Sequence, residues 1–327
     1  MDRQRLIGVV ITVASAFGFA SGTIVARPVY AAGVDWLGFL TWRFVFGAAL
    51  SWLWVAAWPA SRAALRRLER RQVTIAVSLG LLFTLNAGTY FAGLQWIPAS
   101  LAGVIVYIYP VLVAVLASRF TQGLGGPRPW IALGITMVGV LLALGGIPAV
   151  DRPPLLGIVL VMSGGAIYSV YIILSARLSG ERSDRLGRET DPGRATASAA
   201  VTTALTMTGT MVMYLIVATL AGTHFLPAAI PASAWPGLFA GGALGSFLAI
   251  QAFYAGSRRI GAANAALVST VEPVFIVSMA AIFLGEHLAP LQLAGAALVI
   301  VGVVIAQTGA ARGGPQPARP MDAETAG

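Results

Sequence analysis

The amino-acid sequence predicts an all-α integral membrane protein with ten transmembrane helices, arranged as two inverted five-helix repeats. Three observations carry this prediction: an apolar composition, ten apolar stretches long enough to cross a bilayer, and an internal repeat. Of the 327 residues, 57% are hydrophobic and 10% are charged, whereas soluble globular domains carry about 25% charged residues. A chain of this composition is expected to lie in lipid.

Ten stretches reach the length of about 20 mostly apolar residues that a membrane-spanning helix needs. They cover residues 6–26, 36–58, 73–94, 98–118, 129–147, 155–176, 197–221, 235–256, 262–283 and 290–309. Tryptophans lie at or near several of their ends, namely Trp36, Trp58, Trp96, Trp130 and Trp235. Tryptophan is enriched at membrane–water interfaces, so these positions support the assigned ends.

The basic residues predict the orientation of the chain. There are 21 of them, all arginine, and the net charge is +9. With both termini in the cytoplasm, every arginine except Arg27, Arg43 and Arg152 falls on the cytoplasmic side or in a terminal segment there. This bias follows the positive-inside rule and supports an even number of spans. It predicts a plasma-membrane protein with cytoplasmic termini, and it argues against nucleic acid as the partner of the positive charge.

An internal repeat relates the two halves of the chain. Residues 90–146 align without gaps with residues 253–309 at a fixed offset of 163. The alignment pairs Pro110 with Pro273 and, among others, Gly139 with Gly302. Because each copy has five spans, an odd number, the second copy enters the membrane from the opposite side. Inverted repeats of this kind are typical of secondary transporters, whose sites lie between the repeats near the bilayer midplane.

These observations divide the chain into a first repeat over residues 6–147 and a second over residues 155–309. The second repeat contains a charged segment at 177–196, which we expect to be a cytoplasmic loop. The Gly/Pro-rich residues 310–327 are expected to form a disordered tail.

Glu272 is the most informative polar residue, because it lies in the middle of an apolar span. A carboxylate there costs roughly 2.5–3.5 kcal/mol on insertion scales, so it is a functional hypothesis by default. Burial disfavours the charged form, which suits binding of a substrate amine or the cycling of a proton. The structural alternative is a carboxyl group hydrogen-bonded to neighbouring helices. Ser269, one turn earlier, can share the site.

Pro110 and Pro273 occupy matching places in the two copies. A proline inside a helix removes one amide donor and clashes with the carbonyl four residues earlier. We expect a symmetric pair of helix bends that line a central path. The alternative is a pair of packed kinks, which transmembrane helices tolerate.

Arg43 is the only basic residue inside a predicted span, roughly 10 Å below the outer surface by helical rise. It can pair with Glu272 or Asp35, bind an anionic group of a substrate, or extend toward the interface. A structural ion pair or extension toward the interface is favoured over direct substrate binding.

Further polar side chains within the spans are candidates for a substrate cavity: Asn86, Tyr90, Tyr109, Tyr168 and Gln251. Aromatic rings with polar tips suit an amphipathic organic ligand, although each residue alone is more often part of helix packing. Tyr107 and Tyr109 flank the expected bend and cannot easily share one face, so at most one of them is expected to be central.

Three groups of residues resemble the drug/metabolite transporter superfamily, in particular its EamA-like ten-helix transporters. They are Trp42-Arg43-Phe44, the segment 97–102 with Tyr109-Pro110, and Val271-Glu-Pro-Val-Phe275 followed by residues 283–286, Gly295 and Gly302. The chain departs from the family pattern at Phe17-Gly18, where Trp-Gly is common, and at residues 119–124, which lack the Leu-Gly-Glu of residues 284–286. The resemblance implies export or exchange of a small metabolite or drug, with no cofactor and no enzymatic activity.

The leading interpretation is therefore a secondary transporter that moves a small molecule by alternating access, with Glu272 as a candidate for proton coupling. A membrane-embedded enzyme acting on lipid is the first alternative, but the chain has no cysteine and only two histidines, both in predicted loops. No lysine is present, so a phosphate-binding loop of the P-loop type is excluded. A membrane scaffold or sensor is the second alternative. The expected partners are a small-molecule substrate and the bilayer.

Overall fold

The structure is a computed structural model of the chain, and it describes residues 3–93, 96–97, 102, 105–121, 124, 126–143, 154–178, 192–284 and 289–309. All regular structure in these residues is helical, and no strand occurs among them. The helices are α1 (Arg3–Ala31), α2 (Trp36–Ala57), α3 (Pro59–Arg66), α4 (Arg70–Gly93), α6 (Tyr109–Phe120), α7 (Pro127–Ala143), α8 (Leu155–Leu178), α9 (Pro192–Leu220), α10 (Trp235–Gly242), α11 (Ala249–Ile260), α12 (Ala262–Ser269), α13 (Glu272–Leu284) and α14 (Pro290–Gly309). Two 3₁₀ turns, η1 (Pro227–Ala229) and η2 (Ala232–Ala234), and a π-helix, η3 (Ala243–Leu248), complete the described elements.

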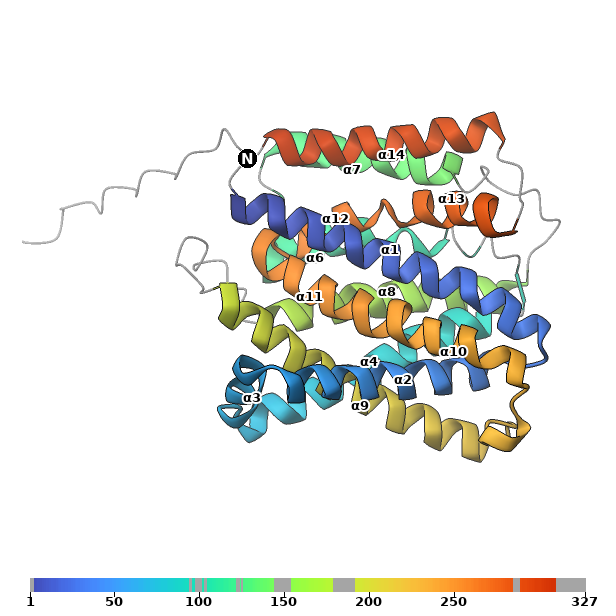
Figure 1. Cartoon of the computed structure of the whole chain (residues 1–327). Coiled ribbons are helices and arrows are strands. Elements are labelled where there is room, and N and C mark those ends of the chain that lie inside the picture. The colour runs from blue at the N-terminus through green and yellow to red at the C-terminus, as the bar shows by residue number, and fades with distance from the viewer. Residues whose placement is uncertain are drawn as a thin grey trace, which may run out of the picture.

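The helices form a bundle in which most elements run along a common direction (Figure 1). Seven helical stretches in the described residues are long and apolar enough to cross a membrane, and α6, α7 and residues 290–306 of α14 are shorter apolar helices. The predicted all-helical membrane protein is thereby confirmed. The predicted loop at 177–196 overlaps the end of α8 and the start of α9. The residues between these helices, like the predicted tail at 310–327, lie outside the described residues.

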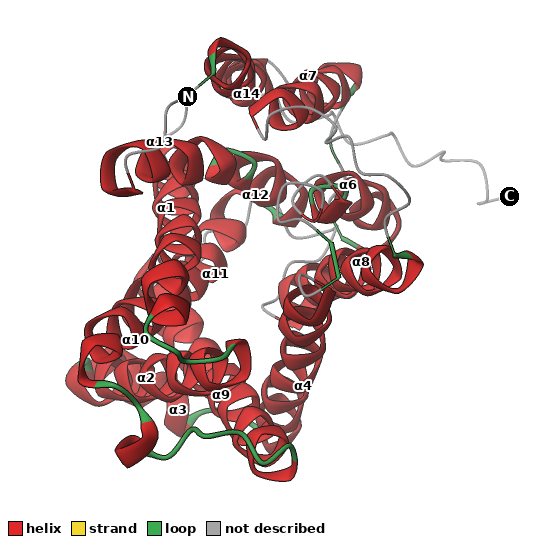
Figure 2. Cartoon of the chain, turned by 90° about the vertical axis from the view of Figure 1, so that its right-hand side faces the viewer, coloured by secondary structure: helices red, strands yellow, loops and turns green. Residues whose placement is uncertain are grey.

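Helices α7 and α14 lie side by side at one edge of the bundle (Figures 1 and 2). Glycines allow this close approach: a Cβ atom added to Gly139 would lie 2.7 Å from the amide nitrogen of Val299, and one added to Gly302 would lie 3.1 Å from that of Thr136. Gly302 and Val299 are the repeat counterparts of Gly139 and Thr136. The same contact thus occurs twice, with the two helices exchanged. Residue numbers rise along one helix as they fall along the other, so the two helices are antiparallel.

A second pair of contacts relates the two halves in the same way. Gly93 at the end of α4 faces Gly157 of α8, and its counterpart Gly256 in α11 faces Gly8 of α1. An added Cβ would lie 3.2 Å from the Gly157 carbonyl oxygen in the first case and 3.1 Å from the Gly8 carbonyl oxygen in the second. The contact of α4 with α8 therefore recurs as the contact of α11 with α1.

The span predicted at 262–283 is two helices rather than one. Helix α12 ends at Ser269, Thr270 and Val271 form a turn, and α13 begins at Glu272. The amide of Val271 donates to the carbonyl of Val268 at 3.2 Å, and the amide of Val274 donates to the carbonyl of Val271 at 3.0 Å. These bonds join residues three apart, so the α-helical ladder is interrupted.

The first repeat has the same interruption at the matching place. Residues 105–106 are helical, Tyr107 and Ile108 form the turn, and α6 begins at Tyr109. The amide of Ile108 donates to the carbonyl of Ile105 at 3.3 Å, and the amide of Val111 donates to that of Ile108 at 3.1 Å. Pro110 and Pro273 each become the second residue of the new helix, where the missing proline amide removes no helical hydrogen bond. The expected bends thus take the form of tight turns that interrupt the α-helical hydrogen bonding just before the prolines.

Candidate site at the helix break around Glu272

Glu272 is the first residue of α13, and its side chain is half-buried. A carboxylate at a helix N-terminus is stabilised by the helix dipole, typically by 0.3–1 kcal/mol. The Tyr107 hydroxyl and the Glu272 carboxyl are close enough to interact. The charge of Glu272 also acts on the hydroxyl groups of Tyr90, Tyr109 and Tyr168. The helix break thus places an acid among tyrosines from three other helical segments.

Tyr107, Tyr109 and Tyr168 belong to a continuous aromatic cluster. The ring centroids of Tyr109 and Tyr168 are 5.0 Å apart, and those of Tyr168 and Tyr171 are 6.0 Å apart in a stacked arrangement. Tyr107 joins through Tyr109, with centroids 6.0 Å apart. The hydroxyl oxygens of Tyr171 and Tyr254 are 2.8 Å apart and share a hydrogen bond. We call these five residues the tyrosine cluster.

Both Tyr107 and Tyr109 contribute to this cluster, contrary to the expectation that at most one of them is central. Residues two apart in a regular helix point in different directions. The turn at Tyr107 and Ile108 removes that restriction. Tyr107 was therefore missed as a site residue, although its proximity to Pro110 could have indicated it.

The two ends of the site differ in exposure. Tyr171 and Tyr254 are 2% and 1% exposed. The Tyr171 and Tyr254 hydroxyl groups are thus bonded to each other in a buried part of the cluster. Residues 85–92 of α4 are exposed or half-exposed. Glu272 itself retains exposed surface although helices surround it.

Arg43 connects α2 to the π-helix η3. Its Nε donates to the Ser246 hydroxyl at 2.9 Å and its terminal nitrogen donates to the Gly245 carbonyl at 2.6 Å. Gly22 and Gly245 leave room for the guanidinium, since an added Cβ on either residue would lie within 3.5 Å of it. The side chain is only 8% exposed. Its charge acts on Glu272 without a direct ion pair between the two.

Asp35, the other expected partner of Arg43, has a different role. Its carboxylate accepts a hydrogen bond from the Gly38 amide at 2.6 Å and so caps the N-terminus of α2. The sequence offered no signal for η3, which supplies the actual partners of Arg43. Single π-turns within α-helices occur frequently at functional sites, and this one lies beside the only buried arginine of α2.

Replacement of Arg43 by lysine is expected to lower the thermal midpoint of the purified protein. A lysine ammonium cannot reproduce the forked pair of bonds to Ser246 and Gly245, and a hydrogen bond to a charged group contributes about 1.5–3 kcal/mol. Differential scanning fluorimetry in detergent measures the effect. Ser246→Ala removes one bond and is the matched control, expected to show a smaller decrease. An Arg43→Lys protein with the wild-type midpoint would contradict the assignment.

The other candidates divide into two groups. The Asn86 amide donates to the Gly164 carbonyl at 2.9 Å and joins α4 to α8, while Tyr90 packs edge-on against Phe91. Both amide atoms of Gln251 and the hydroxyl oxygen of Ser269 are buried and have no hydrogen-bond partner in the structure. Buried polar groups are nearly always satisfied, so Gln251 and Ser269 are the candidates best suited to receive a polar ligand or water.

Comparison with known proteins identifies the family. The model of the EamA-like transporter family matches the chain twice, over residues 6–145 and 155–308. The uncharacterized transporter YcbK of Bacillus subtilis (strain 168) is 26% identical over 300 residues, which cover 90% of each chain. A solved crystal structure is 16% identical in sequence, and its match covers 91% of this chain and 96% of the other chain with a TM-score of 0.72. At this identity the match bears on the fold alone. The protein is therefore a membrane transporter that belongs to the EamA-like transporter family.

Proposed function

We propose that this protein is a secondary transporter that moves a small organic molecule through a site at the paired helix breaks, by alternating access. The observation that carries the proposal is Glu272, a half-buried acid at the N-terminus of α13 that interacts with tyrosines of other helical segments. Broken helices whose ends face a central site are a recurring device of secondary transporters. Family membership favours this activity over a lipid-modifying enzyme or a membrane scaffold.

The architecture we propose has ten transmembrane helices in two inverted repeats. The reciprocal antiparallel contacts of α7 with α14 support it, because contacts that exchange partners indicate a two-fold relation between the halves. Helix breaks at positions 107–108 and 270–271, related by the repeat offset, add further support. The proposal also has both termini in the cytoplasm of a plasma-membrane protein, and the arginine bias supports this orientation.

The substrate class we propose is amphipathic or amino-acid-like, exported or exchanged. Tyrosine rings offer apolar area with hydroxyl groups at their tips, and Glu272 offers a partner for an amine. Proton coupling through Glu272 is part of the proposal. The same carboxyl would bind the proton in one step of the cycle and the substrate in another.

A side-specific labelling experiment tests the inverted architecture. The native chain contains no cysteine, so single cysteines report without background. Arg128→Cys and Leu291→Cys are repeat counterparts at the exposed starts of α7 and α14. We expect a membrane-impermeant maleimide added to intact cells to label Leu291→Cys and to leave Arg128→Cys unlabelled until the cells are opened. Labelling of both from one side would contradict the inverted arrangement.

A substrate screen followed by transport tests the activity itself. Compounds that raise the thermal midpoint of the purified protein are candidate ligands, since a ligand of the native state stabilises it by mass action. Each candidate is then assayed by counterflow in proteoliposomes, with protein-free liposomes as the control. Stabilising ligands that are never transported would favour the scaffold or sensor alternative.

A further inference from the structure

Helix α3 and the connection to α4 carry an unusual density of positive charge. Five arginines lie within ten residues, at Arg62, Arg66, Arg67, Arg70 and Arg71, and Glu69 is the only acidic residue among them. All five side chains are exposed. None of them makes an ion pair with a carboxylate in the described part of the chain. Their exposed guanidinium groups are therefore available to an anion from outside the chain.

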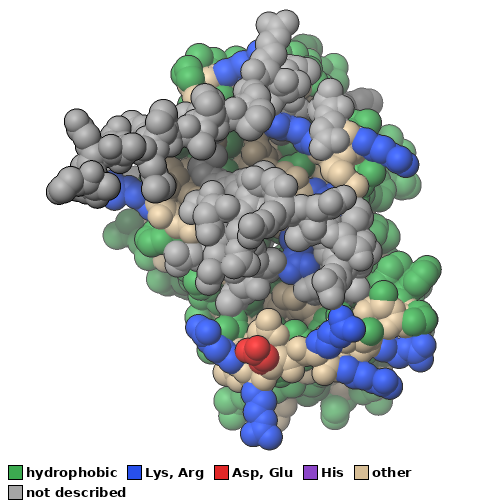
Figure 3. Space-filling model, turned by 90° about the vertical axis from the view of Figure 1, so that its left-hand side faces the viewer, with side chains coloured by type: hydrophobic (Ala, Val, Ile, Leu, Met, Phe, Trp, Pro, Cys, Tyr) green, Lys and Arg blue, Asp and Glu red, His purple; other side chains and the backbone are tan. Residues whose placement is uncertain are grey.

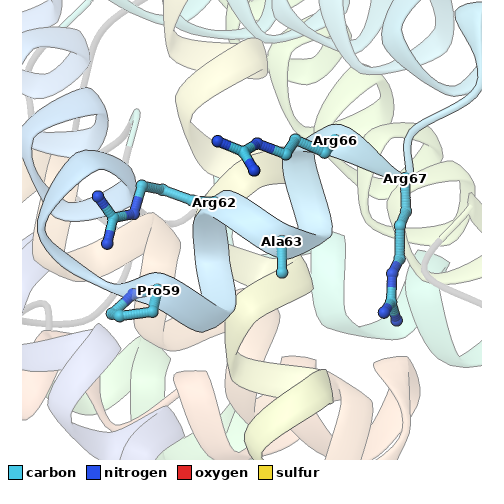
Figure 4. A pocket seen from close by; sticks show the side chains of 5 residues that line it. All are labelled: Pro59, Arg62, Ala63, Arg66 and Arg67. Atoms are coloured by element: carbon cyan, nitrogen blue, oxygen red, sulfur yellow. The ribbon is translucent and has the colours of Figure 1, made fainter.

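Three of these arginines line a surface depression of about 520 Å³, together with Pro59 and Ala63. Figure 4 shows that Arg62 and Arg66 extend to the same side of α3, while Arg67 extends in a different direction. One turn of helix separates Arg62 from Arg66, so both guanidinium groups can reach one anion. The space-filling view shows basic side chains gathered on this end of the molecule (Figure 3).

The opposite face of α3 holds the helix in place. Ser61 is buried, and Ala64 and Leu65 pack against an apolar cluster that includes Val55 of α2 and Val201 of α9. The arginines therefore project from a helix fixed by apolar contacts rather than from a free loop. Such a fixed arrangement lowers the entropic cost of binding.

The position of α3 determines which anion it meets. The helix joins α2 and α4, both long and apolar enough to cross a membrane, so it lies at a membrane surface. Trp58, immediately before Pro59, is 53% exposed and its ring lies 5.4 Å from that of Trp54. Exposed tryptophans of this kind lie at the level of the lipid headgroups. Leu53 of α2, which precedes both of these tryptophans in the chain, is 64% exposed.

We propose that this depression binds the headgroup of an anionic phospholipid, with Arg62 and Arg66 holding its phosphate and with its acyl chains against Trp58 and Leu53. Guanidinium groups bind phosphate oxygens through two parallel hydrogen bonds, and clusters of basic residues beside a transmembrane helix attract anionic lipids. The site is separate from Glu272, and the proposal does not depend on what the protein transports.

Binding of phosphatidylglycerol to the purified full-length protein tests the proposal. The lipid is titrated in non-ionic detergent and bound copies are counted by native mass spectrometry. Phosphatidylcholine and inorganic phosphate serve as separate arms. We expect saturable binding of phosphatidylglycerol alone. Each arginine at an anionic surface contributes about fivefold to affinity, so Arg62→Gln/Arg66→Gln is expected to weaken binding about 25-fold.

Arg70→Gln/Arg71→Gln is the matched control, because it removes the same charge from the same connection outside the depression. It is expected to retain most of the binding. Equal losses in the two double variants would show a general attraction of charge and would overturn the proposed site. Equal binding of phosphatidylcholine, or binding of inorganic phosphate as tight as that of phosphatidylglycerol, would also overturn it. Unchanged circular dichroism of both variants excludes unfolding as the cause of a loss.

Discussion

Replacement of Glu272 by glutamine is expected to reduce substrate transport at least about tenfold and to remove its dependence on pH. A tenfold loss corresponds to about 1.4 kcal/mol, which is close to the lower end of the contribution of a hydrogen bond to a charged group. Glutamine preserves the shape of the side chain and its contact with Tyr107, but it can neither release a proton nor carry charge. Transport into proteoliposomes, measured across a series of pH values, gives both quantities.

Glu272→Asp is the matched control for this experiment. It keeps the carboxyl group but shortens the side chain, so we expect a lower rate with a pH dependence that persists. If Glu272→Gln transports at the wild-type rate with the wild-type pH profile, Glu272 has no part in coupling. The acid would then be a structural residue that stabilises the start of α13.

The second large effect is expected in the packing of α7 against α14. Gly139→Ala is expected to lower the free energy of unfolding by about 1–3 kcal/mol, the usual cost of overpacking. The added methyl group would lie 2.7 Å from the Val299 amide nitrogen and 2.9 Å from the Gly295 carbonyl oxygen. Backbone atoms cannot move aside as a flexible side chain does, so the two helices must separate. Thermal midpoints in detergent measure the change.

Gly134→Ala is the internal control, because Gly134 lies on the same helix with nothing within 4 Å of an added Cβ. Alanine inside a helix is favoured over glycine by roughly 0.5–1 kcal/mol, so this variant is expected to be as stable as the wild type or more stable. Similar effects of the two variants would mean that the close approach of α7 and α14 does not contribute to stability.

The location of the site could be predicted from the sequence because its main signals are local. A carboxylate in an apolar stretch and a proline within a helix each have a cost that does not depend on distant residues. Glu272-Pro273 and Pro110 therefore indicated the region of the helix breaks. The exact form of these breaks, with each proline in the first turn of a new helix, could be seen only in the backbone of the structure.

The surroundings of Arg43 and Tyr107 depend on long-range packing and could not be predicted in this way. Arg43 bonds to the Gly245 carbonyl, 202 residues away in the sequence, and to a π-helix for which composition gives no signal. Tyr107 and Tyr109 both join the tyrosine cluster because of the turn at residues 107–108, whose form the sequence does not give. In both cases an irregular element, which local rules do not describe, positions the side chains.

Alternating access at the helix break is the central claim, and the reactivity of a single cysteine at Val271 tests it most directly. Val271 lies in the turn beside Glu272 and is half-exposed, and the native chain has no cysteine. We expect Val271→Cys, in oriented proteoliposomes, to react with an impermeant thiol reagent added to either side, and the substrate to shift the reaction from one side to the other. Reaction from one side only under every condition, or from neither side, would contradict the claim.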